Sequence, residues 1–329
     1  VPYRLKRPFR ISRGTKSVAD TIFVEIRRGR HIGRGEGVPY TRYDETIDSV
    51  IAQIGSVRDE IEAGADRERL IEIMPPGAAR NAIDCALWDL EAKQTRVSVV
   101  DRIGWGPLGP VDTAITISLD TPENMAAAAQ QLQDVPLLKV KVDASDPIAA
   151  LRAVRQVAPN PRMIVDPNES WSIDQLGSWQ RQLVDLRVDL LEQPLPAKND
   201  ADLEGFESLI PLAADESGHV TDNLGQLARR YDYVNIKLDK TGGLTTALEM
   251  LEAAEREGLG LMMGCMVSSS LSIAPALIIA QRCAFVDLDG PTLLTEDRDN
   301  GVGPWFRQSL ASGVRYIRGL YCAAQKSLA

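Results

Sequence analysis

The chain has 329 residues, of which 44 % are hydrophobic and 25 % charged, and its formal net charge is −9. This length suits a barrel plus a smaller domain, and the composition is ordinary for a soluble globular protein. The acidic balance argues against nucleic acid as a partner, and the apolar stretches are far shorter than the roughly 20 residues of a membrane span.

Cysteine and histidine usage narrows the chemistry further. The four cysteines are scattered and form no CxxC pair, which is typical of free thiols in a reducing compartment. The start of the chain carries no charged, apolar and cleavable signal pattern, so we expect a cytoplasmic protein. The only histidines are His31 and His219, which argues against a thiol–histidine nucleophile and against metal sites built from several histidines.

The first sixteen residues are basic in an otherwise acidic protein. They contain no acid, and their cations are Arg4, Lys6, Arg7, Arg10, Arg13 and Lys16. Two interpretations remain open: a solvated edge strand with its loop, or a segment that faces the substrate.

Residues 1–110 favour a small α+β domain. Two strand-like runs at 21–28 and 31–38 flank a Gly29–Arg30 turn, which predicts a hairpin. Apolar residues at spacings of three and four predict amphipathic helices over 44–64 and 78–93.

Residues 111–300 alternate strands with amphipathic helices, which predicts parallel strands with helices outside. The strand candidates are 113–119, 137–142, 162–166, 188–193, 211–215, 233–238, 259–265 and 284–290. The helix candidates are 122–133, 147–158, 173–186, 200–210, 221–230, 244–258 and 270–283. Eight such units favour a closed (β/α) barrel of the TIM type, and an open doubly wound sheet is the alternative.

Residues 301–329 form a C-terminal segment with mixed helix and turn signals. Two arrangements are open for it: a return to the N-terminal domain, or a loosely held tail.

Five charged residues recur at nearly one interval, each at the end of a short apolar run. The gaps between them are 25, 26, 23 and 22 residues, and the residues are Lys141, Asp166, Glu192, Asp215 and Lys237. A strand, a loop and a helix together take about that many residues, so we expect one functional group at the C-terminal end of each of five consecutive barrel strands.

The three acids of this series predict a metal site. Asp166, Glu192 and Asp215 would repel one another on one buried surface unless a cation neutralised them. Because all the donors are oxygens, Mg²⁺ is the expected ion, with Mn²⁺ as an alternative.

The lysines predict acid–base chemistry on both sides of that metal. Lys139 and Lys141 share one face of their strand, and Lys237 ends a strand across the barrel. A useful base at neutral pH needs a pKa of about 7–8, so we expect neighbouring positive charge to lower the lysine pKa values. One lysine would remove the α-proton of a carboxylate substrate, and the other would return a proton to the opposite face of the enediolate.

The chain resembles the enolase superfamily, in its muconate-lactonizing-enzyme subgroup. The matching motifs are KVK at 139–141, VDPN at 165–168, LEQP at 191–194, ADES at 214–217 and NIKLDKTGG at 235–243. A lysine base acting with Mg²⁺ is already known for this superfamily. The resemblance implies a barrel capped at its mouth by the N-terminal domain, with Asn168 and Asp239 supporting the site.

Within the subgroup, the chain is most similar to dipeptide epimerases that act on L-Ala-D/L-Glu. The resemblance implies that the DLDG motif at 287–290 holds the dipeptide ammonium through Asp287 and Asp289. It implies further substrate contacts from Thr116, and a cation for the distal glutamyl carboxylate from Arg13 first and Lys16 second. Ser268 departs from the pattern, since many relatives carry an acid there.

The implied function is therefore Mg²⁺-dependent epimerisation of a dipeptide in cell-wall peptide recycling, with Lys139 tuning the first base. The same site would serve an N-acylamino-acid racemase, an o-succinylbenzoate synthase or a cycloisomerase, whose substrates lack a free ammonium. A sugar-acid lyase and a non-catalytic dipeptide-binding protein are further alternatives. The sequence leaves the oligomeric state open, a homo-oligomer included.

Overall fold

The computed structural model describes residues 1–219, 223–299 and 301. The C-terminal segment, apart from Gly301, therefore lies outside the described residues, and neither of the two arrangements left open for it is tested.

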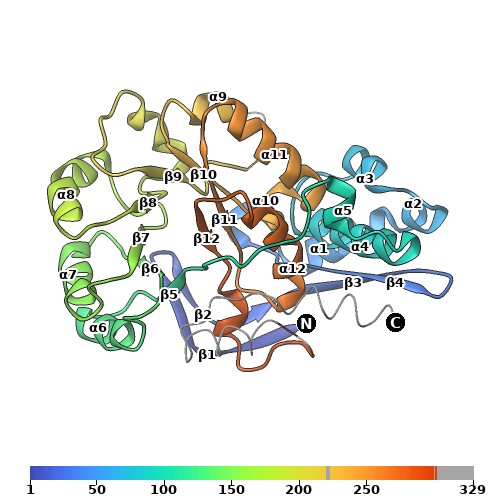
Figure 1. Ribbon diagram of the computed structural model, residues 1–329, viewed down its shortest axis with the longest axis horizontal. Coiled ribbons are helices and arrows are strands. Elements are labelled where there is room, and N and C mark those ends of the chain that lie inside the picture. Colours follow the sequence, from blue (N-terminus) through green and yellow to red (C-terminus); the bar gives the residue numbers. More distant parts are fainter. Residues whose placement is uncertain (220–222, 300, 302–329) are drawn as a thin grey trace.

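Eight parallel strands form one sheet in the order β12-β11-β10-β9-β8-β7-β6-β5 (Figure 1). They are β5 (Ile115–Ile117), β6 (Leu137–Lys141), β7 (Arg162–Asp166), β8 (Leu190–Glu192), β9 (Leu212–Ala214), β10 (Tyr233–Ile236), β11 (Gly260–Gly264) and β12 (Phe285–Asp287). All eight lie within the predicted segments. The barrel prediction is confirmed, because the two ends of the sheet order meet: the Ala114 amide donates to the Val286 carbonyl at 2.7 Å.

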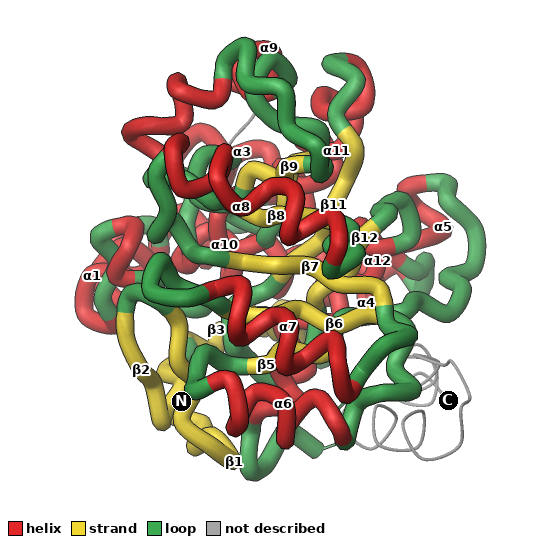
Figure 2. Tube along the Cα trace, turned by 90° about the vertical axis from the view of Figure 1, so that its left-hand side faces the viewer, coloured by secondary structure: helices red, strands yellow, loops and turns green. Residues whose placement is uncertain are grey.

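Helices cover the outside of this barrel. They are α6 (Pro122–Gln130), α7 (Pro147–Val157), α8 (Ile173–Asp185), α11 (Leu244–Arg256) and α12 (Ser270–Ala280). Figure 2 shows α6, α7 and α8 running along the outer side of strands β5 to β8. These three helices begin after a Ser, Thr or Asp cap, whose side chain accepts a hydrogen bond from a backbone amide of the first turn. The caps are Thr121 for α6, Asp146 for α7 and Ser172 for α8.

Two predicted helices are wrong or shorter than expected. The segment 200–210 forms only the end of a 3₁₀ turn, η2 (Ala197–Leu203), and Gly205 then takes a left-handed φ of 81° that ends helical geometry. Its apolar residues Leu203 and Ile210 are still buried, so the apolar spacing reflects packing of an irregular loop. The segment 221–230 contributes the short helix α9 (Leu224–Leu227), and a short helix α10 (Leu238–Thr241) that we did not predict follows β10.

The N-terminal part consists of two antiparallel hairpins and a group of helices. The strands are β1 (Pro2–Ile11), β2 (Gly14–Asp20), β3 (Ile22–Arg28) and β4 (His31–Gly37). The helical elements are η1 (Thr41–Tyr43), α1 (Ile47–Ser56), α2 (Arg58–Ala63), α3 (Arg67–Ile73), α4 (Ala78–Thr95) and α5 (Val99–Ile103). The hairpin prediction at 21–38 is confirmed, whereas the expected helix over 44–64 breaks into α1 and α2 at Val57.

Strand β4 packs directly on helix α4 because its inward residues have no side chains. A Cβ atom on Gly33, Gly35 or Gly37 would lie 2.0–2.2 Å from a carbonyl oxygen of α4, which is closer than any real contact. The alternating glycines therefore allow a strand backbone to touch a helix backbone, and this contact fixes the orientation of α4.

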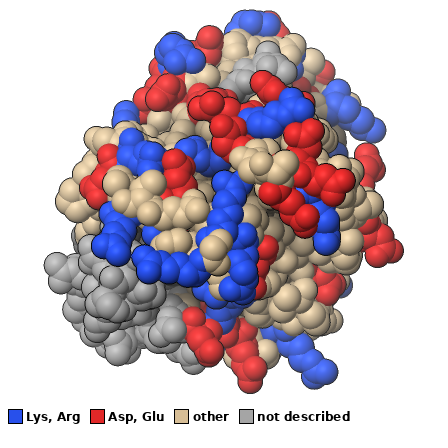
Figure 3. Space-filling view, turned by 90° about the vertical axis from the view of Figure 1, so that its right-hand side faces the viewer, with Lys and Arg blue, Asp and Glu red and all other residues tan. Residues whose placement is uncertain are grey.

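The surface carries charges of both signs. Figure 3 shows acidic and basic side chains next to one another over the face that it presents. No helix in the part of the chain that the structure describes combines the length and the apolar character that crossing a membrane requires.

Helix α4 joins the N-terminal part to the barrel through a buried acid. Asp84 is 1 % exposed and accepts hydrogen bonds from Thr245, at 3.1 Å from the backbone amide and 2.5 Å from the hydroxyl. Burial raises the pKa of Asp84 to about 6, although the bonds from Thr245 oppose that rise.

We expect the Asp84→Asn variant to lose part of the pH dependence of folding. Since the folded pKa of Asp84 lies above its unfolded value, stability is full below the unfolded pKa, near 4, and falls as pH rises towards 6. A pKa difference of that size corresponds to about 3 kcal/mol. Urea unfolding at pH 4, 5, 6 and 7 should show a shallower fall for this variant, with the exposed Glu62→Gln as control. Parallel curves for the wild type and Asp84→Asn would contradict the assignment.

Candidate active site

The five predicted stations lie together at the C-terminal mouth of the barrel. Lys141, Asp166 and Glu192 end β6, β7 and β8, while Asp215 and Lys237 follow β9 and β10 directly. All five are buried. Lys141, Asp215 and Lys237 line a cavity of about 710 Å³ between the mouth, the β1–β2 hairpin and residues 38–47.

Lys139 lies at the centre of the acids. Its Nζ is 2.7 Å from a Glu192 oxygen, 2.7 Å from an Asp287 oxygen and 3.2 Å from an Asp166 oxygen. These acids come from β8, β12 and β7, so one ammonium links both halves of the barrel. Burial alone would lower the pKa of Lys139, but its acidic neighbours raise it well above the ordinary value.

The two predicted bases each contact one acid of the expected metal trio. Lys141 donates to Asp166, and the Lys237 Nζ donates to Asp215 at 2.6 Å. Burial lowers the pKa of Lys237, but the attraction of Asp215 outweighs it and the net pKa is raised. The expected lowering of a base lysine requires positive charge from the metal as well as from a second lysine, and it stays a prediction. In the arrangement described here, carboxylates lie closer to Lys139 and Lys237 than other cations do.

The acids respond unequally to the same environment. Burial raises the pKa of Asp166 and Asp215, but their lysine neighbours dominate and the net pKa of both lies below the ordinary value. Glu192 differs, because burial and the nearby Asp166 raise its pKa to about 7. The cations near Glu192 therefore do not offset the cost of burying its negative charge.

The donor set fits a hard cation, although it is not gathered around one point. Among the described residues, no group of three acidic, histidine or cysteine side chains is close enough to hold a metal ion, because lysine ammoniums lie between the acids. One Glu192 oxygen accepts the Asn235 side-chain amide at 2.9 Å and the other lies 2.7 Å from the Lys139 ammonium. The side-chain oxygen of Asn168 is buried and accepts no hydrogen bond in the described part of the chain. Buried carboxylate and amide oxygens of this kind suit Mg²⁺ better than softer metals.

The predicted ammonium receptors do not act alike. Asp287 gives one oxygen to Lys139 and keeps its other oxygen buried without a hydrogen bond from any described residue. Asp289 accepts the Thr116 amide at 2.6 Å, which ties β5 to the loop after β12. Burial and the charge of Asp287 raise the pKa of Asp289 to about 7. Thr116, Asp287 and Asp289 all line the cavity.

The two candidate cations for a distal carboxylate also line the cavity, but they differ in their contacts. The Arg13 guanidinium donates to Glu169 at 3.0 Å, to Glu216 at 2.5 Å, to the Asn168 carbonyl and to the Tyr40 hydroxyl. Lys16 lies with its Nζ 5.0 Å from the centre of the Tyr40 ring, and it forms no ion pair with the residues that the structure describes. Lys16 is therefore the more available of the two.

Asn168, Asp239 and Ser268 are the remaining predicted residues, and all three are buried near the barrel mouth. The Asn168 amide and side chain both donate to Asp166. Asp239 accepts the Val38 amide at 2.9 Å and the Asn81 side chain at 2.7 Å, so it links α10 to the N-terminal part. Ser268 is fully buried, and its hydroxyl has no hydrogen-bond partner in the described part of the chain.

Sequence reasoning missed two residues that shape the site. Lys240 is buried and donates to the Asp215 side chain at 2.8 Å, to its carbonyl at 2.5 Å and to the Asn235 carbonyl at 2.8 Å. Gln193 accepts the amides of Asp215 and Ser217 and so fixes the loop after β9. Both lie inside motifs quoted above. The spacing of the motifs does not predict the short helix α10, which brings the Lys240 side chain against Asp215.

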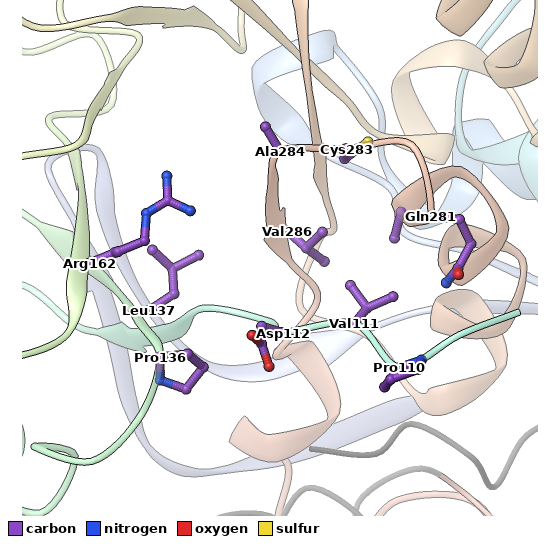
Figure 4. A pocket seen from close by; sticks show the side chains of 11 residues that line it. Pro110, Val111, Asp112, Pro136, Leu137, Arg162, Gln281, Cys283, Ala284 and Val286 are labelled. Atoms are coloured by element: carbon purple, nitrogen blue, oxygen red, sulfur yellow. The ribbon is translucent and has the colours of Figure 1, made fainter.

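A second cavity lies at the opposite end of the barrel. It has a volume of about 280 Å³ and is lined by residues at or before strand starts, among them Leu137, Arg162 and Ala284 (Figure 4). Asp112 is its single acid and Arg162 its single cation, so it has no cluster of carboxylates. The first cavity is the candidate active site.

Comparison with known proteins agrees with this fold and site. Residues 1–104 match the mandelate racemase / muconate lactonizing enzyme N-terminal domain, and residues 124–318 match the enolase C-terminal domain-like family. The chain belongs to the mandelate racemase / muconate lactonizing enzyme family within the enolase superfamily.

Three relatives illustrate the similarity. An L-Ala-D/L-Glu epimerase of Escherichia coli K12 is 47 % identical over 89 % of this chain and 92 % of its own. An N-acetyl-D-glutamate racemase of Pseudoalteromonas is 44 % identical over 84 % of this chain and 88 % of its own. The crystal structure of an Agrobacterium tumefaciens enolase family member, with bound sodium and L-Ala-L-Glu, superposes with a TM-score of 0.90 at 49 % identity and covers 92 % of each chain.

We expect Lys240→Met to destabilise the protein strongly. The substitution removes one charge of a buried pair and leaves Asp215 and two carbonyl oxygens with fewer donors. Breaking such a pair typically costs about 3–5 kcal/mol. Chemical denaturation measures the loss, with the exposed Lys198→Met as control. A loss below about 1 kcal/mol, the range of exposed ion pairs, would show that Lys240 does not hold the loop after β9.

Proposed function

We propose that the protein is a Mg²⁺-dependent dipeptide epimerase that inverts the α-carbon of the C-terminal residue, with L-Ala-D/L-Glu as substrate. The observation that carries this proposal is the placement of Lys141 and Lys237. They stand on β6 and after β10, four strands apart in a sheet of eight, and both line the same cavity. Two amines on opposite sides of one pocket suit proton removal from one face of a stereocentre and delivery to the other.

The comparisons support the same reaction class. The relatives are named as epimerases and racemases, and two solved relatives are complexed with sodium and L-Ala-L-Glu or with Mg and L-Leu-L-Tyr. The chain is accordingly an isomerase, and a dipeptide is its proposed small-molecule partner. The described cysteines are free thiols, which supports a reducing cytoplasm. A role in cell-wall peptide recycling is proposed from the proposed substrate alone.

Asp166, Glu192 and Asp215 would hold the cation. A bound Mg²⁺ would supply positive charge that stabilises the developing enediolate of the substrate carboxylate. Mn²⁺ has the same ligand preference and is a proposed substitute.

The chain's own residues perform the proton transfer in this proposal. The neutral form of one lysine accepts the α-proton at Nζ, while the other lysine, as ammonium, donates a proton to the opposite face. Lys139 contacts the substrate carboxylate and tunes Lys141 by charge. Asp287 receives the dipeptide ammonium, with Asp289 and Thr116 fixing the wall behind it, and Lys16 or Arg13 receives the distal carboxylate.

Asn168 and Asp239 act through their neighbours. Asn168 orients Asp166, and Asp239 holds the loop that carries Lys237 against the N-terminal part. The domain boundaries remain predictions: a capping domain over 1–110, a barrel over 111–300 and a C-terminal segment over 301–329.

We expect Lys141→Ala and Lys237→Ala each to abolish epimerisation, by more than about a thousandfold. Each variant keeps one base, so it should still exchange the α-proton of one epimer for deuterium. The two variants should retain exchange with opposite epimers. Proton NMR of L-Ala-L-Glu and L-Ala-D-Glu in D₂O measures this, with Lys198→Ala as control. Exchange of the same epimer by both variants would rule out bases on opposite faces.

A second candidate is racemisation of an N-acylated glutamate, as in the Pseudoalteromonas relative. A specific contact favours it: Lys139 already occupies one oxygen of Asp287, the expected ammonium receptor. An acylated substrate needs no such receptor.

We expect Asp287→Asn to separate these candidates. If Asp287 binds a substrate ammonium, the variant should lose about 100-fold in kcat/KM for L-Ala-D-Glu, because a buried cation then lacks its anion. We expect only a small rate with N-acetyl-D-glutamate, and Asp287→Asn should not lower that rate as it lowers the rate with L-Ala-D-Glu. Wild-type turnover of the acylated compound alone would refute the dipeptide proposal.

A further inference from the structure

Two segments of the N-terminal part roof the candidate active site. The first is residues 12–16, which include the turn between β1 and β2, and the second is residues 40–43, which include η1. Residues 13–16 and all of 40–43 line the cavity opposite the lysines and acids. We call them the first and second roof segments.

Both roof segments are attached to the barrel through one carboxylate. Glu169 follows Asn168 in the loop after β7, and its oxygens accept Arg42 Nε at 2.7 Å and Arg42 Nη2 at 2.8 Å. The same carboxylate accepts Arg13 Nη1 at 3.0 Å and the Ala197 amide at 2.9 Å. Arg13 comes from the first roof segment and Arg42 from the second.

The backbone holds this carboxylate in place. Asn168 and Glu169 have left-handed φ values of 47° and 67°. Asn enters this region fairly readily, whereas Glu rarely does unless its surroundings hold it there. The Glu169 amide donates to the Gln193 carbonyl at 2.9 Å, and its side chain is 9 % exposed. A rigid, largely buried carboxylate with four charge-assisted or backbone donors is a strong anchor.

The two segments depend on Glu169 to different degrees. Arg42 forms its only ion pair among the described residues with Glu169. Arg13 has a second acid, Glu216 at 2.5 Å, and Ser12 donates to the Asn168 carbonyl at 2.9 Å. The loss of Glu169 should therefore free the second segment more than the first.

We propose that Glu169 is a positioning residue that holds both roof segments over the cavity through Arg42 and Arg13. It lies outside the lining of the cavity and touches no reacting group. Its effect on a ligand passes through the two arginines and through Tyr40, which accepts a hydrogen bond from Arg13 at 3.1 Å.

Hydrogen exchange followed by mass spectrometry tests this attachment without reference to activity. In Glu169→Gln, which keeps the shape but loses the charge, amide exchange at 40–43 should rise about tenfold and exchange at 12–16 by about threefold. In Arg42→Gln, only 40–43 should rise. The control is Glu25→Gln, which breaks the exposed Glu25–Arg34 pair of 2.9 Å on the β3–β4 hairpin.

Two outcomes would overturn the proposal. One is unchanged exchange of both roof segments in Glu169→Gln. The other is a rise spread evenly over the whole protein, which would mean that Glu169 contributes only to general stability. If Glu169→Gln fails to fold, Arg42→Gln decides: unchanged exchange at 40–43 then overturns the attachment.

The kinetic consequence rests on the proposed function. With L-Ala-D-Glu, Glu169→Gln should raise KM about tenfold and change kcat by less than about threefold, because the roof binds the ligand and the lysines are untouched. A fall in kcat with unchanged KM would contradict the positioning role. An inactive wild type would refute the epimerase proposal alone, since the exchange result stands independently.

Discussion

Charge compensation at the barrel mouth is the constraint on which the site depends. Each acid at a strand end would be costly to bury alone. Asp166 and Asp215 are each paired with a lysine from the neighbouring strand, and Glu192 is paired with Lys139 from two strands away. Lys139 carries the largest share, since it neutralises acids on β7, β8 and β12. The strand order brings these charges together, so the same ion pairs stabilise the barrel mouth and position the proposed catalytic groups.

The N-terminal part holds the loop that follows strand β10 of the barrel. Asp239, two residues beyond Lys237, accepts hydrogen bonds from Val38 and Asn81, so the loop carrying one proposed base is held by the capping segment. Arg80 adds bonds to the Gly242 and Thr241 carbonyls at 3.1 and 2.7 Å. Opening of the capping segment would therefore disturb the base as well as the access of ligand.

Much of this arrangement could be predicted from the sequence because strands with a functional end repeat at a nearly constant interval. The period locates Asp166 and Glu192 without knowledge of any contact. Long-range ion pairs leave no such signal: Glu169 meets Arg13 and Arg42 from 156 and 127 residues away, and each alone resembles a solvated charge. The helix expected at 200–210 failed for a related reason, since apolar spacing reports burial and not backbone geometry.

Lys139 connects the proposed metal site with the proposed substrate site, because its ammonium now occupies acids that the two incoming cations would bind. In this structure, its ammonium lies against Glu192 of the proposed metal trio and against Asp287 of the proposed ammonium receptor. A cation that occupied one of these acids would leave the Lys139 ammonium to the other acid, because both acids share one positive charge. Occupation of one site would therefore oppose occupation of the other through Lys139, unless the ammonium leaves both acids for a negatively charged group of the ligand.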